Sequence, residues 1–142
     1  KFIYPALFQI SETNYALALV QTFNETYSGG AMHEEVADFF ELLPNHQSKL
    51  SFQNIPFSVY RMTRACFTEE DYQIGGDGHC HDEENLILNI QYLKSYSWQM
   101  QYHYSRHLSP VSDQKPLNQK KNYILHNDVN ESIRFPSTWT EY

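Results

Sequence analysis

The stretch "SETNYALALVQTFNETYSGG", residues 11–30, decides which fold class this sequence predicts. Its large apolar side chains recur every four residues, at Tyr15, Leu19, Phe23 and Tyr27. That spacing is typical of one face of an α-helix. Ser11 can cap the start of such a helix, and Gly29 and Gly30 can end it. We therefore predict one long N-terminal helix.

The middle of the chain has the composition of β-strands. Residues 55–67 are rich in aromatic and β-branched side chains, which favour strands. Residues 86–93 and 96–104 are separated by two residues, and the second segment alternates apolar with polar side chains, which predicts a hairpin with one apolar face. Residues 36–43 are compatible with a short helix or with a loop that leads into a strand. The predicted fold class is α+β, with the long helix packed on an antiparallel sheet.

Composition limits both the size of the fold and the class of partner. A chain of 142 residues is long enough for one compact domain, which we place at residues 1–108. Residues 109–142 turn to Pro, Ser, Asn, Gln and Lys, and we predict a C-terminal extension that is partly irregular. The net charge of -7 argues against a nucleic-acid partner, which needs a basic surface. No apolar run approaches the roughly 20 residues of a membrane span.

The two cysteines, Cys66 and Cys80, are predicted to form a disulfide. Residues 68–85 between and beyond them are acidic and polar, which predicts a loop. Cys66 ends one predicted strand, and Cys80 lies just before the next. A bridge between them would close a loop of about 15 residues and would stabilise the fold by about 3 kcal/mol.

Two other interpretations of Cys80 are a metal site and a catalytic thiol, because His79 and His81 flank it. Adjacent side chains on an extended backbone point to opposite sides, so three ligands from this triplet would be poorly placed. The surrounding acids disfavour a thiolate. We therefore predict no metal site, no catalytic residue and no cofactor.

Several features predict secretion. The chain begins at Lys1 rather than at a methionine, which suggests a processed N-terminus. The sequons at Asn24 and Asn130 predict N-glycosylation. An even number of cysteines is also typical of an oxidising compartment.

The order of these elements resembles the cystatin superfamily over residues 11–108. The resemblance rests on "ALALVQTFNETYS" (16–28), on "FSVYRMTRACF" (57–67) running into a cysteine, and on a closing hairpin that contains Trp98. It implies a secreted, non-enzymatic binding protein whose antiparallel sheet curves around the helix. It also implies a protein partner, a papain-like cysteine protease, with this chain as a weak or degenerate inhibitor.

The resemblance places the partner-binding residues in two segments. The family's first binding hairpin corresponds to residues 47–51 or 53–57, and its second corresponds to residues 97–98, where Ser-Trp stands in place of the family's Pro-Trp. The candidate partner-binding residues are therefore Gln47, Gln53, Ile55, Pro56, Ser97 and Trp98.

Two alternative functions belong to other classes. In the first, the chain is a small-ligand carrier or an enzyme, in which His103 or Asp38 would transfer protons beside a pocket. The pocket would be lined by an aromatic-rich stripe, Tyr96, Trp98, Met100 and Tyr102. In the second, the chain is a structural or adhesive module that assembles with partner chains, as its 11 tyrosines suggest.

Overall fold

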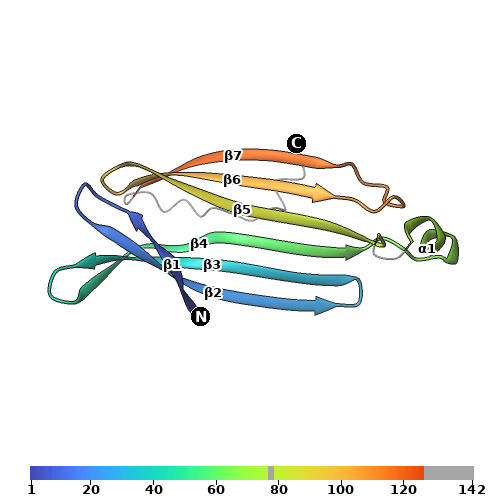
Figure 1. Cartoon of the computed structure of the whole chain (residues 1–142), viewed down its shortest axis with the longest axis horizontal. Coiled ribbons are helices and arrows are strands. Elements are labelled where there is room, and N and C mark those ends of the chain that lie inside the picture. The colour runs from blue at the N-terminus through green and yellow to red at the C-terminus, as the bar shows by residue number, and fades with distance from the viewer. Residues whose placement is uncertain (77–78, 127–142) are drawn as a thin grey trace.

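The computed structural model describes residues 1–76 and 79–126. These residues form one antiparallel sheet of seven strands, in which each strand lies beside the next along the chain, and one short helix (Figure 1). The strands are β1 (Phe2–Gln9), β2 (Tyr15–Tyr27), β3 (Gly30–Leu43), β4 (Gln47–Arg64), β5 (His81–Lys94), β6 (Ser97–His107) and β7 (Leu117–His126), and the helix is α1 (Glu69–Gly75).

The predicted long N-terminal helix, and with it the α+β class, is wrong. Residues 15–27 form β2, which pairs along its length with β3. The physical reason is that four is an even number, so side chains spaced by four share one face of a strand as well as one face of a helix. In β2 the other face carries Ala16, Ala18 and Val20, and all three are buried. Residues 16–20 are all apolar, so the alternation of this strand lies in burial, with Leu17 and Leu19 less buried than their neighbours, and not in polarity.

The remaining predicted elements had mixed outcomes. Residues 36–43 belong to β3 and are not helical. The strand predicted at residues 55–67 lies mostly within β4, and the hairpin predicted at residues 86–104 is confirmed as β5 and β6. The segment 68–85, predicted to be a loop, contains α1 and the beginning of β5. Finally, β7 adds a further strand beside β6.

The sheet opens between β4 and β5 at one end. β4 pairs with β3 from Gln47 onward, but it reaches β5 only over Ser58–Arg64. The second half of β5 pairs with β6 alone. The half of the sheet formed by β1–β4 therefore separates here from the half formed by β5–β7. Side chains from one half can then pack against side chains from the other.

Trp98 of β6 is at the centre of this packing. Its ring centroid lies 4.9 Å from that of Phe39 in β3 and 4.8 Å from that of Phe52 in β4. Its indole Nε1 donates a hydrogen bond of 2.6 Å to the carbonyl oxygen of Gln9. The backbone nitrogen of Tyr96 donates to the Ile10 carbonyl oxygen at 2.7 Å. These contacts fasten the end of β1 to the β5–β6 turn.

A buried carboxylate lies beside the same turn. Glu41 of β3 is buried, and its Oε1 accepts hydrogen bonds from the Tyr96 hydroxyl at 2.7 Å and from the Asn14 side-chain amide at 2.9 Å. The hydrogen bond to Glu41, with a contribution from burial, raises the pKa of Tyr96. The carboxylate therefore links β3 to the β1–β2 turn and to the β5–β6 turn.

Gly30 shows why the β2–β3 hairpin needs glycine. Its φ is 157°, and a Cβ atom there would lie 1.8 Å from the carbonyl oxygen of Met62 in β4. A Cβ at Gly29 would meet only ordinary contacts with Tyr27. The requirement for glycine at position 30 is therefore one of close backbone approach.

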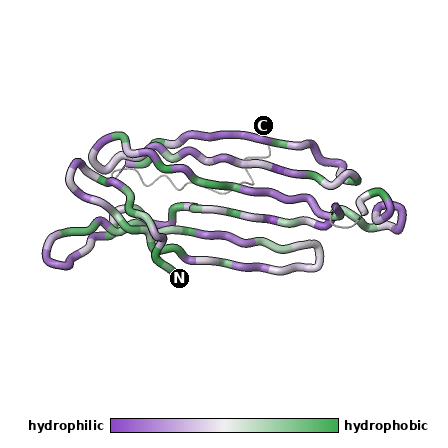
Figure 2. The backbone as a smooth tube through the Cα atoms, viewed as in Figure 1, coloured by the Kyte–Doolittle hydropathy of each residue, from purple (hydrophilic) through white to green (hydrophobic). Residues whose placement is uncertain are grey.

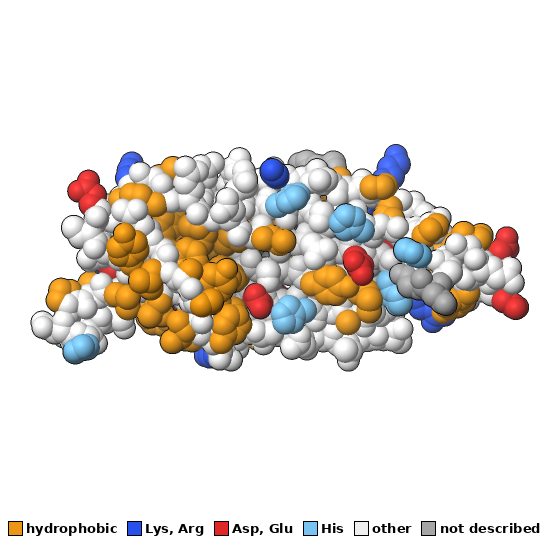
Figure 3. Space-filling view, viewed as in Figure 1, with side chains coloured by type: hydrophobic (Ala, Val, Ile, Leu, Met, Phe, Trp, Pro, Cys, Tyr) orange, Lys and Arg blue, Asp and Glu red, His pale blue; other side chains and the backbone are white. Residues whose placement is uncertain are grey.

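Polarity is distributed unevenly over the molecule. Hydrophobic residues concentrate where β1 crosses the sheet, whereas hydrophilic residues predominate along β7 (Figure 2). The space-filling view shows the same hydrophobic patch on the surface, and acidic side chains at the opposite end around α1 (Figure 3). Within the described residues, no helix has the length and apolar character that a membrane crossing needs.

Candidate functional site

The six candidate partner-binding residues do not form one exposed surface. Gln47 and Gln53 are exposed on β4, whereas Ile55 and Pro56 of the same strand are buried. Ser97 and Trp98 are buried at the start of β6. In this structure the indole of Trp98 is a core side chain that contacts other aromatic rings.

The predicted disulfide between Cys66 and Cys80 is confirmed, with a Cα–Cα distance of 5.0 Å. Both sulfur atoms lie against Gly75 at the end of α1, where a Cβ would be 2.9 Å from the Cys80 sulfur. Thr68 caps the start of α1 by accepting a hydrogen bond from the Asp71 backbone nitrogen. The disulfide joins the chain after β4 to the chain before β5 beside α1, and the cap stabilises the first turn of the helix.

The residues of the alternative enzyme hypothesis lie apart. The imidazole Nε2 of His103 on β6 is 2.6 Å from the side-chain oxygen of Asn118, whereas the carboxylate of Asp38 on β3 accepts a hydrogen bond from the Asn54 backbone nitrogen. Of the aromatic-rich stripe, Trp98, Met100 and Tyr102 are core residues. The stripe thus fills the interior of the fold.

Of the two predicted glycosylation sites, Asn24 lies within the described residues. Asn24 is exposed on β2, and its side-chain oxygen lies 2.6 Å from Nδ1 of His33. Asn130 lies outside the described residues.

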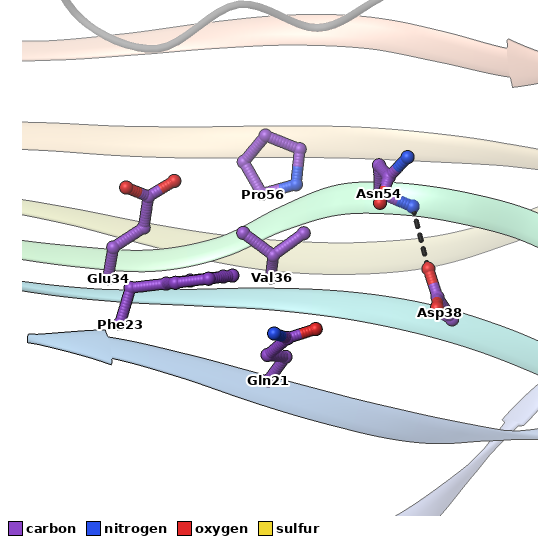
Figure 4. Close-up of a pocket in the computed structure, with 7 residues that line it drawn as sticks. All are labelled: Gln21, Phe23, Glu34, Val36, Asp38, Asn54 and Pro56. Carbon is purple, nitrogen blue, oxygen red and sulfur yellow. Dashed lines mark hydrogen bonds between the residues drawn. The ribbon is translucent and has the colours of Figure 1, made fainter. Parts of the chain in front are cut away.

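A groove on one face of β2, β3 and β4 is the best candidate for a binding site. It has a volume of about 290 Å³. The lining residues are Gln21, Phe23, Glu34, Val36, Asp38, Asn54 and Pro56 (Figure 4). Cross-strand pairing brings them together, because Phe23 pairs with Glu34, Gln21 pairs with Val36, and Val36 pairs with Pro56. One groove is therefore built from three strands that are consecutive in the chain.

The end of the groove at Asn54 is shaped by a bulge in β4. The register between β3 and β4 shifts beside Asp38, and Asn54 has a positive φ of 56°, a conformation that asparagine tolerates better than most residues. The Asn54 backbone nitrogen donates a hydrogen bond of 2.8 Å to Asp38 Oδ1 (Figure 4). Asp38 thereby satisfies a backbone donor that the bulge takes out of the regular ladder.

Sequence reasoning singled out two of these lining residues, each for a different role: Asp38 as a proton-transfer group and Pro56 as a partner-binding residue. Phe23 was assigned to the helix stripe, Val36 and Asn54 lay within the segments 36–43 and 53–57, and Gln21 and Glu34 were not singled out. Their common face follows from the pairing of β2 with β3 and from the bulge in β4. Alternation along β3, which places Glu34, Val36 and Asp38 on one face, is the signal that could have found part of the groove.

Comparison of the chain with protein-family models, with curated proteins and with solved structures gave no significant match. The candidate function therefore depends on the geometry of the site.

Proposed function

We propose that this protein is a secreted, non-enzymatic binding protein that holds a small molecule in the groove over β2, β3 and β4. The observation that carries the proposal is the groove itself, with Val36 and Pro56 as apolar contacts and polar side chains at its ends. Small-molecule sites commonly combine apolar lining with a few polar groups that orient the ligand. A volume of about 290 Å³ suits a compact ligand.

The non-enzymatic part of the proposal follows from the lining chemistry. The groove contains no Ser, Cys, Lys or His among the described residues that line it. The ionisable lining side chains are the carboxylates of Glu34 and Asp38, and neither has one of these groups beside it in the groove as a partner for nucleophilic catalysis. The carboxylate of Asp38 is already bonded to the Asn54 backbone.

Secretion is supported by the disulfide, since such bonds persist in oxidising compartments. The exposed sequon at Asn24 fits the same compartment. Neighbouring residues of a strand point to opposite faces, so a glycan on Asn24 would project away from the face on which Phe23 lines the groove. Glycosylation would therefore leave the groove open.

Replacing Phe23 with alanine is expected to weaken ligand binding about fivefold, because the ring forms one wall of the groove. The test uses three probes of one shape, tyramine, tyrosol and 4-hydroxyphenylacetate, titrated at millimolar concentration while backbone amide NMR shifts are recorded. At least one probe should shift the amides of Val36 and Asn54.

The matched control is Tyr27→Ala, which removes another exposed aromatic ring of β2 that does not line the groove. This variant should bind as the unchanged protein does. If none of the three probes shifts the groove amides, or if both variants lose binding equally, the proposed function is wrong.

Inhibition of a papain-like protease, which the cystatin resemblance implies, stays a prediction. Ser97 and Trp98 are buried, so they offer no wedge to a protease cleft in this structure. We therefore do not include inhibition in the proposed function.

A second candidate function is protein binding through β1. Among residues 1–76 and 79–126, this strand pairs with β2 alone, so one of its edges has no strand beside it. Its exposed apolar side chains are Phe2, Ile3, Tyr4 and Leu7. Natural edge strands use lysine and proline against unwanted pairing. The strand β7 carries Lys120 and Lys121, whereas β1 carries no charged residue and has Pro5 as its one such residue. Strand addition to β1, with β1 of a second copy as the partner, suits this chemistry.

Replacing Ile3 with lysine is expected to weaken self-association at least about tenfold, because it places a charge at the apolar edge. Sedimentation over a range of protein concentrations measures this directly. Ile87→Lys is the matched control, since Ile87 is similarly exposed, at 60% against 63% for Ile3, but lies on the interior strand β5. A strict monomer at all concentrations, or equal effects of both lysines, would count against strand addition.

A further inference from the structure

We infer that the ligand of the groove is an organic cation, an amine with a compact apolar body, an inference that rests on the proposed function. Three features of the groove support this assignment: its acidic side chains, the aromatic ring of Phe23, and the polar end at Asn54.

The charged residues of the groove have one sign. Glu34 and Asp38 are its only charged lining residues among those described, and both are acidic. Within the described residues, the carboxylate of Glu34 makes no hydrogen bond and no ion pair, whereas Asp38 already accepts the Asn54 backbone donor. The whole chain has a net charge of -7, which attracts cations over a longer range. The free carboxylate of Glu34 is thus the group that a ligand cation would meet.

An aromatic ring lies beside that carboxylate. Phe23 and Glu34 are cross-strand partners on β2 and β3, and the ring of Phe23 extends from below Glu34 toward Val36 (Figure 4). The face of an aromatic ring attracts a cation through its quadrupole. An ammonium group at this end can therefore contact a ring and a carboxylate together.

The rest of the groove suits an uncharged body with a polar far end. Val36 and Pro56 form a cross-strand pair in the middle and supply apolar contact. Asp38 is four residues beyond Glu34 on the same strand, a separation of roughly 13 Å between Cα atoms. The side-chain amide of Asn54 lies at this far end (Figure 4) and can hydrogen-bond a hydroxyl group.

An anion is disfavoured in the same groove. It would approach two carboxylates without a lining Lys, Arg or His to neutralise it. A neutral molecule of the same shape keeps the apolar contacts and the far hydrogen bond but gains nothing from Glu34. The order of affinity should therefore be cation, then neutral molecule, then anion.

The test compares three probes that share a phenol ring and differ in the charge of the side chain: tyramine is cationic, tyrosol is neutral, and 4-hydroxyphenylacetate is anionic. Tyramine should bind about tenfold more tightly than tyrosol, a typical sum for one exposed ion pair and one cation–π contact. Added salt should weaken tyramine binding and leave tyrosol binding unchanged.

Glu34→Gln should lower tyramine affinity about threefold, because it removes the ion pair and leaves the cation–π contact with Phe23, and it should not change tyrosol binding. Glu35→Gln is the matched control because it removes the same charge from the next residue of β3. The side chain of Glu35 lies on the opposite face, where it accepts a hydrogen bond from the Ser58 hydroxyl at 2.9 Å. This control should leave the affinities for both probes unchanged.

The outcomes separate this inference from the proposed function. If tyrosol and tyramine bind equally well at the groove amides, the groove binds ligands but the cation assignment is overturned. If Glu35→Gln weakens tyramine as much as Glu34→Gln does, the effect comes from net charge, and the assignment to Glu34 is overturned. If no probe binds, the proposed function itself fails.

Discussion

Replacing Trp98 with alanine is expected to lower the free energy of unfolding by about 3–5 kcal/mol, the usual cost of removing a buried tryptophan. Trp98 is 0% exposed and contacts rings from the other half of the sheet, Phe39 and Phe52. Alanine would leave a cavity where the two halves of the sheet meet. It would also leave the Gln9 carbonyl oxygen without the indole donor. Urea denaturation followed by circular dichroism measures the loss.

Two further variants make this result specific. Trp98→Phe retains a ring but removes the hydrogen bond to Gln9, so it should cost less than Trp98→Ala. Ile124→Ala removes a side chain that is exposed on β7, and it should change the free energy of unfolding by less than about 1 kcal/mol. A loss below about 1 kcal/mol for Trp98→Ala would show that the two halves of the sheet do not pack through this residue.

Removing the disulfide is expected to lower the free energy of unfolding by about 3 kcal/mol, because it relaxes the constraint on the unfolded chain. The separation of Cys66 and Cys80 is 14 residues. The double variant Cys66→Ala/Cys80→Ala also loses the contacts that the two buried sulfur atoms make with Gly75, which lowers the free energy of unfolding further. Urea denaturation of the double variant and of the reduced protein gives two measurements of the same bond.

The two measurements should agree within about 1 kcal/mol. Thr68→Ala is the control for α1, since it removes the helix cap and leaves the disulfide in place. That variant should cost only about 1 kcal/mol. Equal stability of the oxidised and reduced proteins would contradict the prediction.

The elements that could be predicted from the sequence are those encoded over short distances. The hairpin of β5 and β6 was predicted because two residues separate two apolar segments, and a short connection leaves antiparallel pairing as the direct solution. The disulfide was predicted because its cysteines lie at the ends of neighbouring strands. In both cases the partners are close in the chain, so the interpretation needed no knowledge of distant contacts.

The first half of the chain could not be predicted in this way. Tyr15, Leu19, Phe23 and Tyr27 satisfy both a helix and a strand, because a spacing of four suits both periods. The structure resolves this ambiguity by pairing β2 with β1 on one side and with β3 on the other. Burial of Ala16, Ala18 and Val20 against the core then favours the strand, since tertiary contacts override local propensity.

The candidate groove also shows the difference between what nearby residues encode and what distant contacts decide. The sequence by itself determined the acidic charge of the chain, the short β5–β6 hairpin and the cysteine pair, because each depends on composition or on residues that are near one another in the chain. Only the tertiary structure decided that Phe23, Glu34 and Asn54 share one groove. Their proximity requires the register of β2 on β3 and the bulge of β4 at Asn54. A shift of one residue in a strand would turn these side chains to the opposite face, and that register is fixed by packing across the whole sheet.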